Sequence, residues 1–216
     1  MPSASQAAAA PFRTSPFQRT DSAGLVTRVD PDTELIARFV DGDQRAFEAL
    51  FAKYRDYVYN ISYQMVGNPD DASDLTQETF FRVWRALPHF QGNSQFSTWL
   101  YRIAVNACIS ELRKRPKTPP MSIEDEENLA PLHGMDDQRS AEQTFMRRLA
   151  QERVREVVQT LPPDYKTVIV LRHFQELSYQ EIAAVMGCTV GAIKIKLHRA
   201  RKMFRSRFES TAQEGD

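Results

Sequence analysis

The sequence is poor in cysteine and in long apolar runs, and each shortage excludes a class of protein. Cys108 and Cys188 are the 2 cysteines among 216 residues, so a disulfide-stapled scaffold is excluded and a reducing compartment is expected. No stretch approaches the roughly 18 apolar residues of a membrane-spanning helix. The alanines of residues 1–10 follow no basic segment, so we expect no secretory signal and a cytoplasmic protein.

Motifs of catalysis and of metal binding are also lacking. No glycine-rich phosphate loop or nucleophile elbow occurs. Cys188, His173 and His198 are near one another in the sequence, but their spacing matches no zinc pattern. The acidic residues of segment 70–74 lie at a predicted helix start, where they favour the helix dipole. We therefore expect no metal, no cofactor and no catalytic residue, with an enzyme built on a helical core as the alternative.

An excess of charge of one sign is absent overall but present locally. The 28 basic and 28 acidic residues cancel, which alone argues against a nucleic-acid binder. Residues 31–90 hold 6 basic and 10 acidic side chains, a net of −4, and residues 116–145 hold 2 and 7, a net of −5. By contrast, residues 91–115 hold 4 basic side chains and 1 acidic side chain, a net of +3. Residues 178–208 hold 7 basic side chains and 1 acidic side chain, a net of +6. Because screening confines a charge to roughly 10 Å, the two basic blocks can still attract phosphates.

The hydrophobic pattern is helical throughout, with no strand-like alternation. Apolar residues recur at helical spacing within segments 30–42, 47–67, 68–88 and 96–115, and glycine or proline separates the segments. Four helices with short connections predict one compact helical domain. Residues 1–29 are rich in Ala, Ser, Thr and Pro, show no period, and predict a disordered tail.

A proline-rich acidic segment, residues 116–138, separates this domain from a second helical region. Its composition predicts a flexible linker. Fully extended, the linker reaches at most about 75 Å, which corresponds to roughly 22 base pairs of duplex. The two flanking domains could therefore contact well-separated sites on one DNA molecule.

The pattern of residues 178–207 is that of a helix-turn-helix. Ser178 and Glu181 form a capping box, Gly187 ends the short first helix, and Thr189 can cap the second. Gly191 leaves room for the second helix to enter the major groove. The side chains that can reach phosphates and guanine edges are Lys194, Lys196, His198, Arg199, Arg201, Lys202, Arg205 and Arg207. A solvated basic helix that ends a helical hairpin is the alternative.

A basic segment with aromatic residues also occurs in the first domain. Trp99, Tyr101, Arg102 and Asn106 follow a polar loop, and this combination suits opened strands because unstacked bases can stack on rings. Trp99 also lies on the apolar stripe of its helix, so core packing is the competing interpretation.

Four stretches in this order carry a family resemblance. They are DLTQETFFRVWRAL (74–87), FSTWLYRIAVNACISELRKR (96–115), LPPDYKTVIVLRHFQELSYQEIA (161–183) and VGAIKIKLHRAR (190–201). Over about residues 32–208 the chain resembles the extracytoplasmic-function (ECF) sigma factors, the small initiation factors of bacterial RNA polymerase. The resemblance implies an all-α protein with two small helical domains joined by a flexible linker. Residues 30–115 would be sigma region 2, residues 139–208 sigma region 4, and residues 209–216 a short tail.

The resemblance also implies site residues and partners. The β′ clamp of core RNA polymerase would be bound by Asp74, Gln77, Glu78, Phe81 and Trp84. The −10 element and its melted strand would be bound by Gln91, Asn93, Ser94, Trp99, Tyr101, Arg102, Asn106, Arg113 and Lys114. The −35 element would be read by Val190, Gly191, Lys194, Lys196, His198, Arg199 and Arg201. The remaining partners would be the β flap of the polymerase and an anti-sigma factor, which usually holds members of this family inactive.

One departure from the family and one rival function remain. Ile195 and Lys196 stand where many relatives carry Ser and Arg, and lysine lacks the bidentate fork with which arginine binds guanine. The −35 preference is therefore open. The rival function is a stand-alone regulator that uses the same helix-turn-helix and binds duplex DNA without polymerase.

Overall fold

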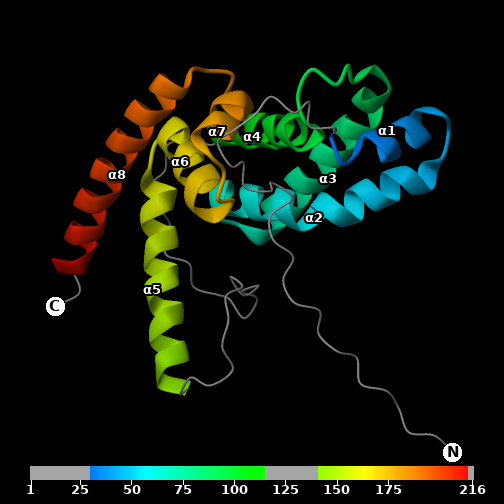
Figure 1. Cartoon of the computed structure of the whole chain (residues 1–216). Coiled ribbons are helices and arrows are strands. Elements are labelled where there is room, and N and C mark those ends of the chain that lie inside the picture. Colours follow the sequence, from blue (N-terminus) through cyan, green and yellow to red (C-terminus); the bar gives the residue numbers. More distant parts are fainter. Residues whose placement is uncertain (1–29, 115–140, 214–216) are drawn as a thin grey trace, which may run out of the picture.

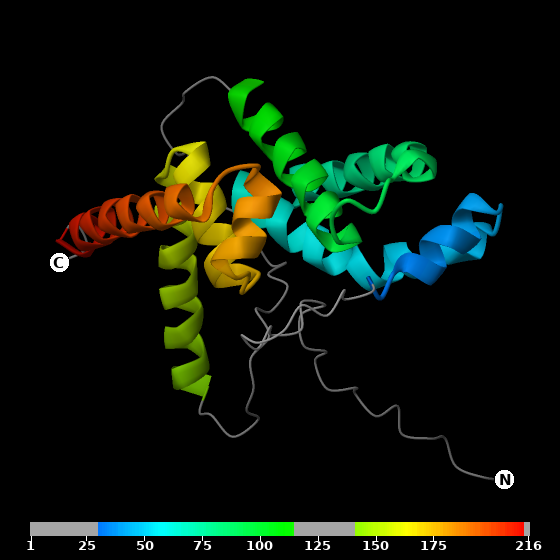
Figure 2. The same cartoon turned by 45° about the horizontal axis from the view of Figure 1, so that its top comes forward.

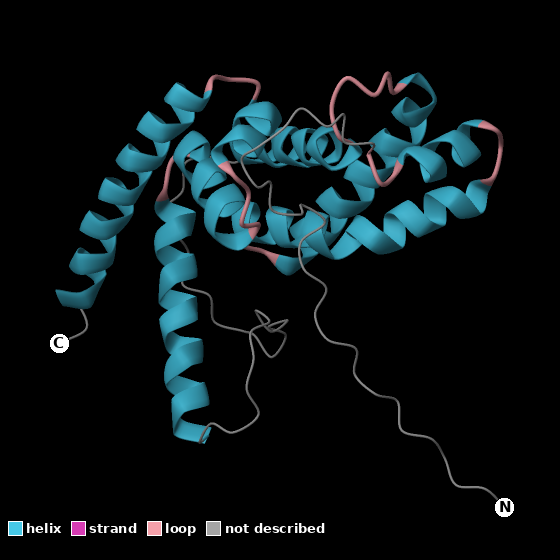
Figure 3. Cartoon of the chain, viewed as in Figure 1, coloured by secondary structure: helices cyan, strands magenta, loops and turns pink. Residues whose placement is uncertain are grey.

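The computed structural model describes residues 30–114 and 141–213. The predicted tail 1–29, the linker 116–138 and residues 214–216 lie outside the described residues. Within the described ranges the chain forms helices and connecting loops and no strand (Figure 3). The all-α prediction is therefore confirmed.

The first bundle comprises α1 to α4. These helices are α1 (Thr33–Val40), α2 (Gln44–Val66), α3 (Pro69–Ala86) and α4 (Phe96–Lys114), with a 3₁₀ turn at Leu87–His89. The side chain of Asn68 accepts a hydrogen bond from the backbone N–H of Asp71 and caps α3. Gly67 ends α2 at φ 79°, a left-handed conformation that glycine adopts without strain.

The second bundle comprises α5 to α8. These are α5 (Ala141–Thr160), α6 (Pro163–Ile169), a π-helical turn at Val170–Phe174, α7 (Tyr179–Met186) and α8 (Val190–Gln213). Helix α8 continues beyond residue 209, where the sequence predicted a tail. The ring of Phe208 stacks on Phe204 at 5.7 Å between centroids and lies under the guanidinium of Arg153 on α5. This packing against α5 stabilises the last turns of α8.

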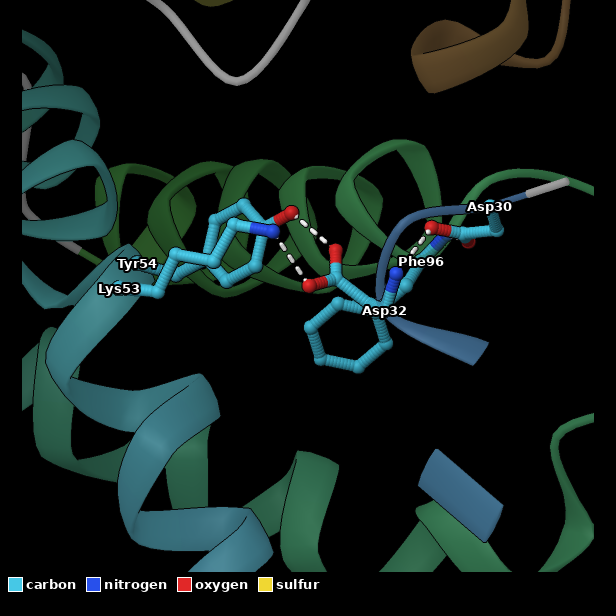
Figure 4. A network of polar contacts seen from close by, with 5 residues as sticks. All are labelled: Asp30, Asp32, Lys53, Tyr54 and Phe96. Carbon is cyan, nitrogen blue, oxygen red and sulfur yellow. Dashed lines mark hydrogen bonds and ion pairs between the residues drawn. The ribbon is translucent and has the colours of Figure 1, made fainter. Parts of the chain in front are cut away.

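A buried network fixes α1 against α2 and α4 (Figure 4). Asp32 is 1% exposed, and its carboxylate accepts hydrogen bonds from Lys53 and Tyr54 of α2. The carboxylate of Asp30 accepts from the backbone N–H of Phe96, 2.5 Å away, and caps the start of α4. Burial and the Asp32 carboxylate raise the pKa of Tyr54 well above its usual value. Asp30 and Asp32, at the beginning of the first predicted helical segment, thus connect three helices.

The two bundles pack directly on each other through the C-terminal end of α2 (Figures 1 and 2). The buried Lys166 of α6 donates to the carbonyl of Met65 at 3.0 Å and to the side-chain oxygen of Gln159 at 2.8 Å. Gln159 donates in turn to the carbonyl of Gln64 at 2.8 Å. These carbonyls belong to the last turn of α2, whose orphan acceptors and negative dipole end favour a cation. The hydrophobic core is continuous across this contact.

Candidate nucleic-acid interface

Helix α8 separates an apolar face from a cationic face. Ile193, Leu197 and Ala200 are buried, at the 4- and 3-residue spacing of one helix stripe. The exposed face contains the predicted readers Gly191, Lys194, His198, Arg199 and Arg201, together with Ile195, Lys202 and Arg205. The cationic face therefore projects into solvent, as a DNA-reading helix requires.

The turn before α8 has the predicted helix-turn-helix geometry. Ser178 and Glu181 form the reciprocal capping box at the start of α7. Gly187 ends α7 at φ 64°, and the hydroxyl of Thr189 accepts from the backbone N–H of Ala192 at 3.2 Å. Gly187 and Thr189 lie between the two helices, so they shape the turn from which α8 leaves α7.

Two members of the predicted −35 set, Lys196 and Val190, are less exposed than the others. The ammonium of Lys196 lies 2.7 Å from the carboxylate of Asp164 on α6, and the Lys196 side chain is 32% exposed. Val190 is half-buried and packs against the core. In this structure both side chains contact the second bundle instead of facing outward with Lys194 and Arg199.

Helix α3 exposes all five residues of the predicted polymerase-binding set. Phe81 is 59% exposed and Trp84 is 47% exposed, while Asp74, Gln77 and Glu78 are also exposed. The opposite face of α3 is buried and consists of Ala72, Leu75, Thr76, Thr79, Phe80 and Val83. The exposed ring of Trp84 therefore has no role in the core. The guanidinium of Arg85 lies over the ring of Phe81, 5.8 Å from its centroid.

The polar loop before α4 is largely exposed. Gln91 and Asn93 are exposed and hydrogen-bond to each other at 3.1 Å, whereas Ser94 is half-buried. Gly92 between them has φ 68°, a conformation that few other residues adopt. Trp99 is half-buried, with ring centroids 4.9 Å from Phe90 and 5.9 Å from Phe96. Core packing thus explains why part of the Trp99 ring is buried.

Helix α4 places its predicted DNA-facing residues in two environments. Arg102, Asn106, Arg113 and Lys114 are exposed. Tyr101 is 1% exposed, and its ring lies 6.4 Å from that of Tyr54 in the core. The prediction that Tyr101 faces the melted strand is wrong for this conformation, because the α4 stripe that contains Leu100 and Ala104 also buries Tyr101.

The candidate surfaces of the two bundles meet at one contact. The guanidinium of Arg102 donates to the backbone carbonyl of Ala184 on α7. One predicted −10 residue therefore hydrogen-bonds to the helix-turn-helix while it remains exposed. Sequence reasoning missed this contact and the burial of Lys166, because each pairing joins segments about 80 to 100 positions apart.

The described residues give little support for metal binding, for a reactive thiol or for a membrane-spanning helix. No group of three or more His, Cys, Asp or Glu side chains occurs there that could hold a metal ion. Burial raises the pKa of the Cys108 thiol to about 11, so at neutral pH it is not a reactive thiolate. Among the described helices, none combines the length and apolar character of a membrane span.

Known proteins share this arrangement of a first helical bundle followed by a helix-turn-helix. The family model of sigma-70 region 2 matches residues 50–118, and that of sigma-70 region 4 matches residues 151–204. The RNA polymerase sigma-H factor of Pseudomonas aeruginosa is 38% identical over 176 residues, which cover 80% of this chain and 91% of that protein. The ECF RNA polymerase sigma-E factor of Haemophilus influenzae is 34% identical over 181 residues, which cover 82% of this chain and 95% of that protein. This chain belongs to the ECF sigma factors.

Two solved structures are also similar to this sigma factor. Among solved structures, CnrH in complex with the cytosolic domain of CnrY has a TM-score of 0.62 at 26% identity and covers 83% of this chain and 97% of CnrH. The Bartonella quintana sigma factor RpoE, solved with the anti-sigma factor NepR, has a TM-score of 0.56 at 22% identity and covers 75% of this chain and 96% of that chain, which shows a shared fold.

Proposed function

We propose that this sigma factor binds core RNA polymerase, recognises −35 and −10 promoter elements, and promotes DNA melting for transcription initiation. The observation that carries the proposal is the pair of exposed surfaces on α3 and α8, each within the matching family region. The factor supplies binding surfaces, and catalysis belongs to the polymerase. It acts in the cytoplasm, where core polymerase and promoter DNA are found.

The exposed face of α3 is the polymerase-binding surface in this proposal. Phe81 and Trp84 are large aromatic side chains that the core does not use. Exposed aromatic residues that become buried on association supply much of the binding free energy of interfaces. Asp74, Gln77 and Glu78 form the polar part of the same face, and its target is the β′ clamp.

Promoter recognition is divided between the two bundles. Gln91, Asn93 and Ser94 capture a flipped −10 base, and Arg102, Asn106, Arg113 and Lys114 follow the melted strand. Helix α8 enters the major groove at the −35 element, and the second bundle also contacts the β flap. Flipping a base requires a few kcal/mol, which a preformed polar loop can supply by holding the extruded base.

This function favours separation of the bundles. In the packed conformation the exposed guanidinium of Arg102 donates to the backbone carbonyl of Ala184 on α7, so DNA that binds this arginine has to replace that contact. An extended segment 116–138 would span at most about 75 Å, enough for the two bundles to occupy distant promoter elements. We infer that opening of the bundles accompanies polymerase binding.

An anti-sigma factor would regulate this opening. The similar CnrH was solved in complex with the cytosolic domain of CnrY, and a protein of that kind would occlude the polymerase- and promoter-binding surfaces. Affinity capture of the chain from unstressed cells should yield such a partner, and its absence would contradict this part of the proposal.

In-vitro transcription tests the proposal as a whole. Core polymerase is incubated with a genomic-fragment library, with and without this protein, and start sites are sequenced. New start sites that depend on the protein are expected, with two shared upstream elements. If no new start sites occur and the free protein binds duplex DNA tightly, the chain is a stand-alone regulator instead.

A further inference from the structure

One apolar side chain lies in the middle of the cationic face of α8. Ile195 is 56% exposed. Its neighbours one turn away on the same face are Gly191, His198 and Arg199, and all three are exposed. The only apolar side chain in the centre of this face therefore lies among predicted −35 readers.

The fold gives no reason for isoleucine at this position. The buried stripe of α8 is complete with Ile193, Leu197 and Ala200, and Ile195 points away from it. A β-branched residue is also a weaker helix former than lysine or arginine, which occupy the neighbouring exposed positions. Neither packing nor helix propensity explains Ile195.

Gly191, one turn before Ile195, has no structural role either. A Cβ atom there would meet only the hydroxyl of Thr189 at 3.9 Å, so internal packing would tolerate a side chain. The benefit of glycine at this position lies outside the fold, because a missing side chain lets another surface approach Ile195 closely.

The major groove offers one apolar group on its base edges, the C5-methyl of thymine. We propose that Ile195 contacts a thymine methyl in the −35 element and makes this sigma factor prefer thymine at that position. This inference rests on the proposed function. Lys196, the adjacent residue, is held by Asp164 at 2.7 Å and does not compete for the same base edge.

The test uses reconstituted holoenzyme with the full chain. A promoter library randomised over the −35 element is selected with the unaltered protein, and each selected thymine is then replaced singly by deoxyuridine, which removes only the C5-methyl group. At one thymine we expect about a fourfold loss of promoter binding, the factor that burial of one methyl group supplies. Ile195→Ala should bind more weakly and lose the response to deoxyuridine at that position. Ile195→Val, which keeps a branched methyl, should retain the response.

Val40→Ala is the matched control, because Val40 is 53% exposed and lies on α1, away from α8. It should select the same −35 sequence as the unaltered protein and respond equally to deoxyuridine. If the unaltered protein and Ile195→Ala respond alike at every thymine, or no thymine is selected, the thymine contact is wrong while the sigma function stands. Absence of any promoter-dependent transcription by the unaltered protein would overturn both.

Discussion

At the scale of single residues, exposure decides which side chains are available to partners. Phe81 and Trp84 share α3 with the buried Phe80, and only the 3.6-residue period separates the two environments. Tyr101 and Arg102 are adjacent on α4, yet one is in the core and the other is exposed. Function at this scale therefore depends on a residue's position around its helix.

Trp84→Ala should weaken binding to core polymerase by about 30-fold, the effect of removing an interface hot spot of about 2 kcal/mol. The thermal midpoint should change little, because the ring is 47% exposed. Titration of core polymerase with labelled protein measures the affinity. Leu149→Ala, at an exposed apolar residue of α5, is the control and should bind normally. An unchanged affinity, or loss of the fold, would contradict a surface role for Trp84.

The Cys108 thiol should make the protein less stable in mild alkali. Its pKa is raised by burial from 9.0 to about 11, so the unfolded chain ionises first and the stabilisation is lost as pH rises from 9 to 11. Between pH 8.5 and 10 we expect a loss of about 1 kcal/mol in unfolding free energy. Urea unfolding across this range measures it. Cys108→Ala should lack this part of the decline, and Cys188→Ala should keep it; equal slopes in both variants would contradict the assignment.

At the scale of elements, helix caps determine where α7 and α8 begin. The capping box of Ser178 and Glu181 satisfies two backbone donors at the start of α7. The hydroxyl of Thr189 satisfies one backbone donor, the N–H of Ala192, at the start of α8. These caps are encoded within a few residues and need no distant contact, so they define the helix-turn-helix locally.

Ser178→Ala should lower the free energy of unfolding by about 1 kcal/mol, because the backbone N–H of Glu181 loses its acceptor. Thermal denaturation followed by circular dichroism measures the loss. Ser206→Ala, at an exposed position of α8, is the control and should be neutral. Equal stability of the two variants would show that the cap contributes nothing.

At the scale of the whole molecule, Lys166 connects the two bundles. Its side chain is 3% exposed and donates across the interface to the carbonyl of Met65. Gly67 admits this close approach, because a Cβ there would lie 2.9 Å from the side chain of Gln159. The packed arrangement thus depends on a few polar contacts at the end of α2.

Lys166→Met should shift the molecule toward an open form, because two acceptors at the interface lose their donor. Small-angle X-ray scattering should give a larger radius of gyration, and core polymerase should bind more tightly because the open form is already populated. Gln159→Ala should act in the same direction, whereas Lys202→Met, at an exposed lysine, should resemble the unaltered protein. An unchanged scattering profile in both interface variants would contradict a role in closure.

Local sequence patterns encode the helices, their caps and the helix-turn-helix. The stripe from Leu50 to Met65, the stop at Gly67 and the capping box at Ser178 depend on spacing and on side chains within one or two turns. The cap that Asp30 places on α4 and the link that Lys166 makes between the bundles emerge only in the packed fold. Each of these joins or positions residues far apart in the chain, and no local pattern encodes such pairing, because its free energy comes from burial and desolvation when the whole chain packs.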